Sequence, residues 1–211
     1  MTVMMRPQQL ANHSTREFSM LIDGQWVAGA EGKTIERMSP AHGVVVSRYQ
    51  SATRVDAERA IAAARKAFDT GPWPHMTAAE RSLILLRAAD IMEQRRDELA
   101  RLDTLESGKP ISQAKGEIGG AIDIWRYAAA LARDVHGESV NTLGEGTLGV
   151  VLREPIGVVS IITPWNFPFL IVSQKLPFAL AAGCTAVVKP SDLTSGSTLV
   201  MGEILMKAGL P

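Results

Sequence analysis

One amide side chain in this sequence is placed where it could stabilise an oxyanion. The short β-branched run at residues 158–162 predicts a buried strand, and the turn Thr-Pro-Trp-Asn-Phe-Pro follows it at residues 163–168. Pro168 can open a helix, because a first-turn position needs no N–H. Asn166 is therefore expected at the carboxyl end of a strand, where open α/β sheets bind ligands, and its N–H₂ group could donate to an oxyanion. A proline-framed turn with a solvated Asn is the alternative.

Several motifs occur in an order that resembles one protein family. Pro-Trp-Asn-Phe-Pro at residues 164–168 is followed by Val-Val-Lys-Pro-Ser-Asp at 187–192. Together these resemble the NAD(P)-dependent aldehyde dehydrogenase superfamily, and the resemblance runs from about Met20 to the last residue. Three further stretches resemble the family's N-terminal strand pair, its helix-joining turn and the start of its nucleotide-binding core: residues 21–27, 106–110 and 153–158.

The resemblance implies a fold and a reaction. The fold would be α/β, with an N-terminal arm and helical layer on an incomplete doubly wound parallel, Rossmann-like sheet. The reaction would be NAD(P)-dependent oxidation of an aldehyde to a carboxylic acid, with Asn166 as the catalytic oxyanion donor. The family's nucleophilic Cys and general-base Glu lie further downstream. We therefore expect an N-terminal fragment that is inactive alone; the alternative is a non-catalytic truncated module that binds a partner chain, or an inactive gene remnant.

Two charged residues follow the next predicted strand, at residues 185–189. Lys189 ends this strand and Asp192 lies three residues further on. An ammonium and a carboxylate at a strand end can bracket ribose hydroxyls, because the first donates hydrogen bonds and the second accepts them. From the residues alone, an exposed Lys and a helix-capping Asp are favoured. The resemblance instead implies that both residues contact the adenosine ribose of the cofactor.

The resemblance also implies further cofactor contacts and a cofactor preference. Ile162 and Thr163 would contact the cofactor through their backbone, Trp165 would line its cleft, and Ser191 belongs to the same motif as Lys189. Core packing is an equally supported role for Ile162. The family most often has Glu where this sequence has Asp192. A carboxylate repels a ribose 2′-phosphate and favours NAD, but the shorter Asp weakens this preference, so NADP stays the alternative.

Residues near the turn would line a substrate tunnel by the same resemblance. Phe167, Ile171 and Gln174 match positions along the family's aldehyde tunnel, and core packing is a rival role for the first two. Cys184 is the only cysteine. No His or Lys stands near it in sequence to lower its pKa, so a buried, inert thiol is expected. The resembling family's nucleophile lies elsewhere.

Composition excludes several classes of protein. Apolar residues make up 46% of the 211 residues, which excludes a disordered chain, and Lys+Arg equals Asp+Glu at 22 each. Zero net charge argues against a nucleic-acid surface, and no apolar run approaches a membrane span. The four histidines are too far apart in sequence to predict a metal site. A single cysteine fits a reducing compartment, and we expect a cytoplasmic protein.

The hydrophobic pattern and the resemblance together divide the chain into four parts. We expect a disordered tail at residues 1–19, an N-terminal arm and helical part of the cofactor-binding domain at 20–136, an oligomerisation strand segment at 137–155, and the truncated start of the nucleotide-binding sheet at 156–211. By resemblance, the full-length form would be a homo-oligomer that acts on an aldehyde. Helices are expected to begin near Thr53 and Thr77, and over these further stretches: 97–105, 113–133, 168–182 with a kink at Pro177, and 195–207.

Two predicted helices show a clear apolar face. In the first helix this face holds Ala57, Ile61, Ala64 and Phe68. In the helix over 113–133 the stripe consists of Ile118, Ala121, Ile122, Trp125, Ala128, Ala129 and Ala132. The Gly-x-Gly-x-x-Gly match at residues 144–149 follows a polar loop and opens a strand rather than a helix. It therefore predicts a turn, not a dinucleotide fingerprint.

Overall fold

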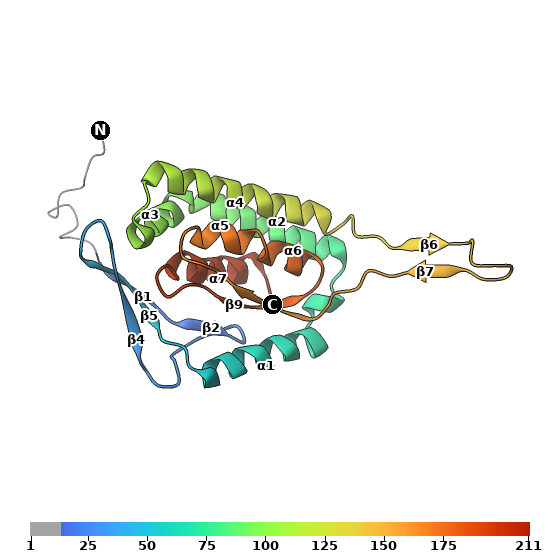
Figure 1. Cartoon of the computed structure of the whole chain (residues 1–211), viewed down its shortest axis with the longest axis horizontal. Helices are drawn as coiled ribbons and strands as arrows, with labels where there is room; N and C mark the ends of the chain where they lie inside the picture. Colours follow the sequence, from blue (N-terminus) through green and yellow to red (C-terminus); the bar gives the residue numbers. More distant parts are fainter. Residues whose placement is uncertain (1–13) are drawn as a thin grey trace.

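The computed structural model describes residues 14–211 (Figure 1). Its helices are α1 (Arg54–Thr70), α2 (Ala78–Gln94), α3 (Arg96–Ser107), α4 (Ile111–Leu131), α5 (Pro168–Ser173), α6 (Leu176–Ala181) and α7 (Gly196–Ala208), with a 3-10 turn, η2, at Trp73–His75. Its strands are β1 (Arg16–Phe18), β2 (Met20–Ile22), β3 (Gln25–Val27), β4 (Thr34–Met38), β5 (Val45–Gln50), β6 (Glu138–Val140), β7 (Gly149–Val151), β8 (Val158–Ile162) and β9 (Thr185–Lys189).

The strands form separate small sheets. In the arm, β5 pairs in parallel with β1 and antiparallel with β4, while β2 and β3 form a hairpin. Strands β8 and β9 pair in parallel from Val158 opposite Thr185 to Ile162 opposite Lys189. The connection between them runs through α5 and α6, and α7 follows β9. This strand–helix–strand–helix order is the beginning of a doubly wound sheet, as predicted.

The core lies among the helices. Helix α4 packs against α2, α3, α5 and α6, and α7 packs against α2 and α3; Figure 1 shows these helices stacked together above α1. The indole N–H of the fully buried Trp125 donates to Ser173 Oγ at 3.0 Å, which joins α4 to the end of α5. The stripe predicted for α4 is confirmed, because each of its seven residues is at most 2% exposed.

Two helix starts follow local capping signals. Thr53 and Asp56 form a capping box at α1, and Thr77 and Glu80 form one at α2. The Asp56 carboxylate also accepts a hydrogen bond from the backbone N–H of Ala30 at 3.1 Å. One carboxylate thus caps α1 and attaches the arm to it, and its pKa is lowered first by the hydrogen bond from the Thr53 backbone.

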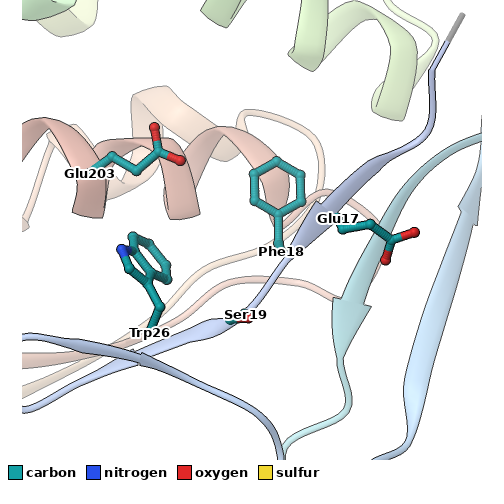
Figure 2. Close-up of a pocket in the computed structure, with 5 residues that line it drawn as sticks. All are labelled: Glu17, Phe18, Ser19, Trp26 and Glu203. Atoms are coloured by element: carbon teal, nitrogen blue, oxygen red, sulfur yellow. The ribbon is translucent and has the colours of Figure 1, made fainter.

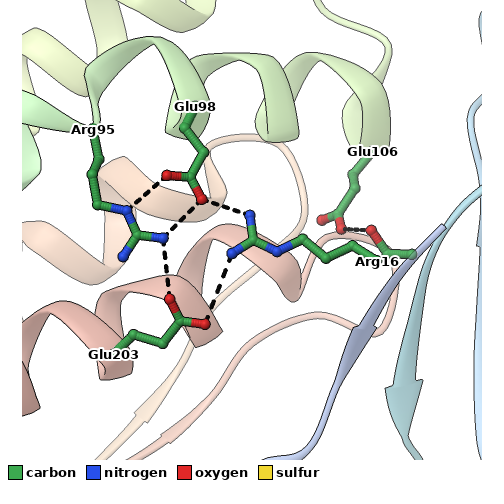
Figure 3. Close-up of polar contacts among 6 residues, drawn as sticks. Arg16, Arg95, Glu98, Glu106 and Glu203 are labelled. Carbon is green, nitrogen blue, oxygen red and sulfur yellow. Dashed lines mark hydrogen bonds and ion pairs between the residues drawn. The ribbon is translucent and has the colours of Figure 1, made fainter. Parts of the chain in front are cut away.

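The predicted tail boundary was wrong. Arg16–Phe18 is not disordered but forms β1, while residues 1–13 of the predicted tail lie outside the described residues. Arg16 bonds Glu98 at 2.7 Å, and Arg95 bonds Glu98 at 2.7 Å and Glu203 at 3.1 Å (Figure 3). This network connects β1 to α3 and α7 through contacts far apart in sequence, which no local pattern could predict.

The helix predicted over residues 168–182 is broken into two. Helix α5 ends at Ser173 and α6 begins at Leu176, so the chain breaks rather than kinks. The ring of Pro177 would clash with the carbonyl of residue i−4, which is Ser173, and Pro177 has no N–H to offer. The break falls where that clash would begin, and Pro177 is instead accommodated in the first turn of α6.

Burial differs from prediction at α1 and β8. Ala57 and Ile61 are exposed, and within the predicted α1 face only Ala64 is buried. Of the five β8 residues, only Ile161 is buried. Helix α1 packs on β8 and β9, and this sheet has only two strands within the described chain. A two-stranded sheet covers only part of the α1 face, so Ala57 and Ile61 stay exposed. Most of β8 is likewise left uncovered by other elements.

Candidate functional site at the carboxyl ends of β8 and β9

Two strand ends meet at one edge of the parallel sheet. The backbone N–H of Thr163, just beyond β8, donates to the carbonyl oxygen of Lys189 at 3.2 Å. A turn follows each strand, and the hydroxyl of Thr194 in the second turn donates to the Trp165 carbonyl in the first, also at 3.2 Å. The structure therefore brings the two predicted motifs into contact, at the edge where ligands bind in open α/β sheets.

The turn after β8 presents Asn166 to solvent. Thr163 is buried, and its hydroxyl has no hydrogen-bond partner within residues 14–211. Trp165 is 52% exposed, and the Asn166 side chain is also exposed. Pro168 occupies the first turn of α5, as predicted. The Asn166 amide is therefore held beside a helix start on a turn whose backbone is anchored.

A buried cation anchors the backbone of this turn. Lys109, in the turn between α3 and α4, donates from Nζ to the carbonyl oxygen of Asn166 at 2.8 Å. The same ammonium pairs with the Glu117 carboxylate and lies 4.8 Å from the centre of the Phe167 ring. These contacts attach the candidate oxyanion donor to the helical layer.

The turn after β9 holds the polar candidates for ribose binding. Lys189 and Asp192 are exposed, and Ser191 is half-buried. The Ser191 hydroxyl lies 3.4 Å from an Asp192 carboxylate oxygen and accepts from the Leu193 backbone N–H at 3.2 Å. Helix α7 begins at Gly196 with Ser195 as its N-cap, so the helix-capping alternative for Asp192 is wrong.

A buried carboxylate fixes the start of α7. Glu106, at the end of α3 (Figure 3), is fully buried. Its Oε2 accepts from the Gly196 backbone N–H at 3.1 Å and its Oε1 from the Ser47 hydroxyl at 2.5 Å. Burial raises the Glu106 pKa. A Cβ at Gly196 would lie only 2.4 Å from Glu106 Oε1, so the carboxylate can approach only because residue 196 is glycine.

The predicted tunnel residues lie within α5 and at its two ends. Ile171 is inside the helix, and Phe167 and Gln174 are its N-cap and C-cap residues. Phe167 and Ile171 are half-buried and Gln174 is exposed. Within the described chain, the core beneath α5 is formed instead by Phe169 and Val172. Ile162 is 71% exposed, so core packing, its alternative role, is wrong in this chain.

Cys184 lies at the wrong end of its strand for chemistry with Asn166. It is buried, as predicted, and directly precedes Thr185, the first residue of β9. Asn166 follows the carboxyl end of β8, which pairs in parallel with β9. Five residues of extended strand, at about 3.3 Å each, separate these two ends of the sheet. The thiol therefore does not face the candidate oxyanion donor.

A hollow beside β1 and β3 has polar groups that already pair with other residues. A pocket of about 220 Å³ is lined by Phe18, Ser19, Trp26, Glu17 and Glu203 (Figure 2). Both of its carboxylates already pair with arginines, Glu17 with Arg48 and Glu203 with Arg95. Among residues 14–211, no three His, Cys, Asp or Glu side chains gather as a metal site, and no helix is long and apolar enough to cross a membrane.

Sequence reasoning missed three residues that build the site. Glu106 and Lys109 belong to Glu-Ser-Gly-Lys-Pro, which predicted only a helix-joining turn, and Thr194 was not considered. Each contacts a residue at least 29 positions away in sequence. The presence of Glu106 and Lys109 in one short turn was the available signal. Their partners could not be predicted, because those partners are distant in sequence.

Fold and site together define the class: an α/β protein with a polar, ligand-accessible edge at the carboxyl ends of parallel strands. The sequence profile of the aldehyde dehydrogenase family matches residues 26–211. The chain therefore belongs to the aldehyde dehydrogenase family, and the resemblance seen in the motifs is confirmed.

Named relatives and solved structures agree with this assignment. Aldehyde dehydrogenase family 2 member C4 of Arabidopsis thaliana is 40% identical over 91% of this chain and 38% of its own length. The NADP(+) D-glyceraldehyde dehydrogenase of Thermoplasma acidophilum is 41% identical over the same share of this chain. A solved NAD-dependent aldehyde dehydrogenase from Sinorhizobium meliloti superposes with a TM-score of 0.92 and 50% identity, over 94% of this chain and 40% of that one. This chain thus spans about 40% of the length of these proteins.

Proposed function

We propose that this chain supplies the oxyanion donor and the adenosine-ribose half of the cofactor site in an NAD(P)-dependent aldehyde dehydrogenase. The observation that carries this proposal is the junction of the Asn166 turn with the Lys189–Asp192 turn at one strand edge. Family membership supplies the reaction class, and the substrate would be an aldehyde.

The exposed groups at this edge suit a dinucleotide. Thr163 has a buried hydroxyl without a partner in the described chain, and Lys189 and Asp192 extend into solvent beside it. The Lys189 ammonium would donate to ribose hydroxyls, and the Asp192 carboxylate would accept from them. Betaine aldehyde dehydrogenase from Staphylococcus aureus, solved with NAD+, matches this fold with a TM-score of 0.88 and 36% identity. When bound, the nicotinamide accepts a hydride.

Asn166 would act on the substrate side. In the resembling family a thiolate adds to the aldehyde carbon, and the carbonyl oxygen becomes an oxyanion. The Asn166 N–H₂ group donates to that oxygen, and such a donor typically contributes about 10²–10³-fold in kcat. Cys184 and its surroundings supply neither this nucleophile nor the base that hydrolyses the acyl-enzyme. Both would come from polypeptide other than residues 1–211.

The preferred cofactor would be NAD. A carboxylate at residue 192 repels a ribose 2′-phosphate, which disfavours NADP. The cofactor choice differs among relatives, since the Thermoplasma acidophilum enzyme is named for NADP(+). The single, buried thiol fits a reducing compartment, and we place the protein in the cytoplasm.

The hairpin β6–β7 would join copies of the enzyme. It projects from the body of the molecule in Figure 1, and Leu143, Leu148, Val150 and Leu152 are all at least 60% exposed. Exposed strand edges and apolar side chains invite pairing with another chain. A homo-oligomer built through this hairpin is the arrangement we propose. The same surface would serve the second candidate function, a non-catalytic module that binds a partner chain.

One chimera tests the enzymatic proposal. Residues 14–211 replace the matching segment of the Sinorhizobium meliloti enzyme, to which they are 50% identical. NADH formation with several aldehydes is expected from the chimera and not from the 211-residue chain. A folded chimera that binds no NAD and oxidises no aldehyde would favour the partner-binding module.

Two controls complete this test. Turnover by the 211-residue chain itself that disappears in Cys184→Ser would make Cys184 the nucleophile and overturn the assignment. The coding sequence beyond Pro211 is the second check. An in-frame continuation with a Phe-x-x-x-Gly-Gln-x-Cys motif supports the enzyme, and a stop codon supports the module.

A further inference from the structure

Lys109 has a largely covered side chain with an unusual set of contacts. Its side chain is only 8% exposed, although lysine is almost never buried unless paired. Its ammonium bonds the Glu117 carboxylate on α4, donates to the Asn166 carbonyl at 2.8 Å, and lies over the Phe167 ring at 4.8 Å. It thus contacts a helix, the backbone of the candidate oxyanion donor and the first predicted tunnel residue.

Glu117 fixes where this ammonium lies. The Glu117 side chain is only 9% exposed and also accepts from the Gln113 amide at 2.8 Å. Two buried, opposite charges hold each other strongly, because separating them leaves an uncompensated charge in the interior. The Lys109 ammonium is consequently a fixed point of the helical layer rather than a mobile surface group.

The Lys109 ammonium holds the carbonyl oxygen of the peptide unit that joins Asn166 to Phe167. That unit is planar, so holding its oxygen in place restricts the backbone rotation that sets the direction of the Asn166 side chain. The Asn166 side chain itself is exposed. An oxyanion donor must be held within about 0.5 Å of its productive position. Because the exposed Asn166 side chain is not held by packing, the hydrogen bond from Lys109 to its backbone carbonyl can supply this restraint.

We propose that Lys109, held by Glu117, is a positioning residue that orients Asn166. This inference rests on the proposed function, in which Asn166 is the oxyanion donor. In this role Lys109 acts through the Asn166 carbonyl, to which it donates. A simpler role, in which the ion pair only fastens α4 to the β8–α5 turn, would affect stability but not the orientation of Asn166.

The first test uses the 211-residue chain and nuclear magnetic resonance. Lys109→Met is expected to shift the Asn166 carbonyl carbon resonance and to lower the backbone order parameters of Asn166 and Phe167 from about 0.85 to below about 0.6. The matched control is Lys115→Met, which removes an exposed ion pair between Lys115 on α4 and Asp97 on α3. The control should leave both residues unchanged.

A double variant separates orientation from stability. Lys109→Met with Glu117→Leu removes both charges, so no unpaired charge stays buried and stability recovers. The proposal requires that the Asn166 resonances stay shifted in this stable double variant. If they return to their wild-type values, or never shifted in Lys109→Met, Lys109 does not position Asn166.

Kinetics in the chimera provide the second test. A displacement of about 1 Å can cost roughly 10²-fold in rate, so Lys109→Met and the double variant should lower kcat by up to that factor with KM for NAD unchanged. An unchanged kcat in both variants would overturn the positioning role. Failure of the proposed function is distinguishable, because then Asn166→Ala would itself leave kcat unchanged while the resonance shifts still occur.

Discussion

The backbone N–H of Thr163 donates to the carbonyl oxygen of Lys189 at 3.2 Å, across the carboxyl ends of β8 and β9. These residues are 26 positions apart (189 − 163), yet this bond brings the turn that carries Asn166 beside the turn that carries Asp192. The candidate oxyanion donor, Asn166, and the candidate ribose-binding pair, Lys189 and Asp192, thereby follow neighbouring strands at one sheet edge.

Asn166→Ala in the chimera should lower kcat by roughly 10²–10³-fold and change cofactor affinity much less. In the proposed function the amide donates to an oxyanion that exists only during the chemical step, so the loss is expected there. Single-turnover rates and NAD binding are the measurements. A normal single-turnover rate with weakened NAD binding would make Asn166 a structural residue of the turn.

Lys189→Ala in the chimera should weaken cofactor binding by about 1–3 kcal/mol, because charge-assisted hydrogen bonds to the ribose are lost. Titration calorimetry with NAD measures the change directly. Lys175→Ala is a suitable comparison, since Lys175 is also exposed but lies at the start of α6. Equal affinities in wild type and Lys189→Ala would exclude a ribose contact.

Asp192→Ser should shift preference toward NADP, because it removes a negative charge near the expected 2′-phosphate position. The ratio of kcat/KM for NADP and NAD in the chimera is the quantity to compare. Asp192→Glu serves as the matched control and should retain or strengthen the NAD preference. No gain in NADP use on removing the carboxylate would show that Asp192 does not face the ribose.

Asp103 should make stability depend on pH. Burial raises the pKa of this carboxyl, on α3, from 3.8 to about 7, and neither oxygen has a hydrogen-bond partner within the described chain. The folded protein therefore keeps this proton where the unfolded chain has lost it. The resulting stability is fully present below about pH 4, falls as pH rises toward about 7, and is level above that.

Asp103→Asn should flatten this slope in urea unfolding measured from pH 5 to pH 8, and the variant should be the more stable protein at the upper end. Some slope should remain, because burial also raises the Glu106 pKa. Asp97→Asn, an exposed carboxylate on the same helix, should leave the slope unchanged. Parallel wild-type and Asp103→Asn profiles would contradict the prediction.

The β6–β7 hairpin should mediate association. Val150→Lys with Leu152→Lys places charges on its exposed apolar surface and should shift the protein toward monomer in size-exclusion chromatography with light scattering. Glu145→Lys, between the two strands, should have little effect. A wild-type chain that stays monomeric at high concentration would speak against the hairpin as an assembly surface.

Local sequence patterns predicted helices and strands correctly where the stabilising contacts join residues close together in the sequence. Capping boxes at Thr53 and Thr77 marked two helix starts, since each satisfies backbone N–H groups within one turn. β-Branched runs located β8 and β9, and the spacing of apolar residues identified the buried stripe of α4. The order of short motifs was enough to identify the family.

The burial of individual residues and the pairing of distant segments could not be predicted from these local patterns. The apolar spacing of α1 predicted a buried face, but Ile61 is 54% exposed because burial depends on what lies opposite. Strand β1 was missed because its pairing with β5 and the Arg16–Glu98 bond involve distant residues. The position of the α5–α6 break depended on where the Pro177 clash fell.

The sequence by itself determined which groups are available for chemistry: an amide on a proline-framed turn, an ammonium and a carboxylate after the next strand, and one thiol with no activating neighbour. Only the tertiary structure decided where they lie. Parallel pairing of β8 with β9 joined the two turns and placed Cys184 at the opposite end of the sheet. Folding also brought the Lys109 ammonium to the Asn166 carbonyl, because a buried charge must find its partners in space, whatever their separation along the chain.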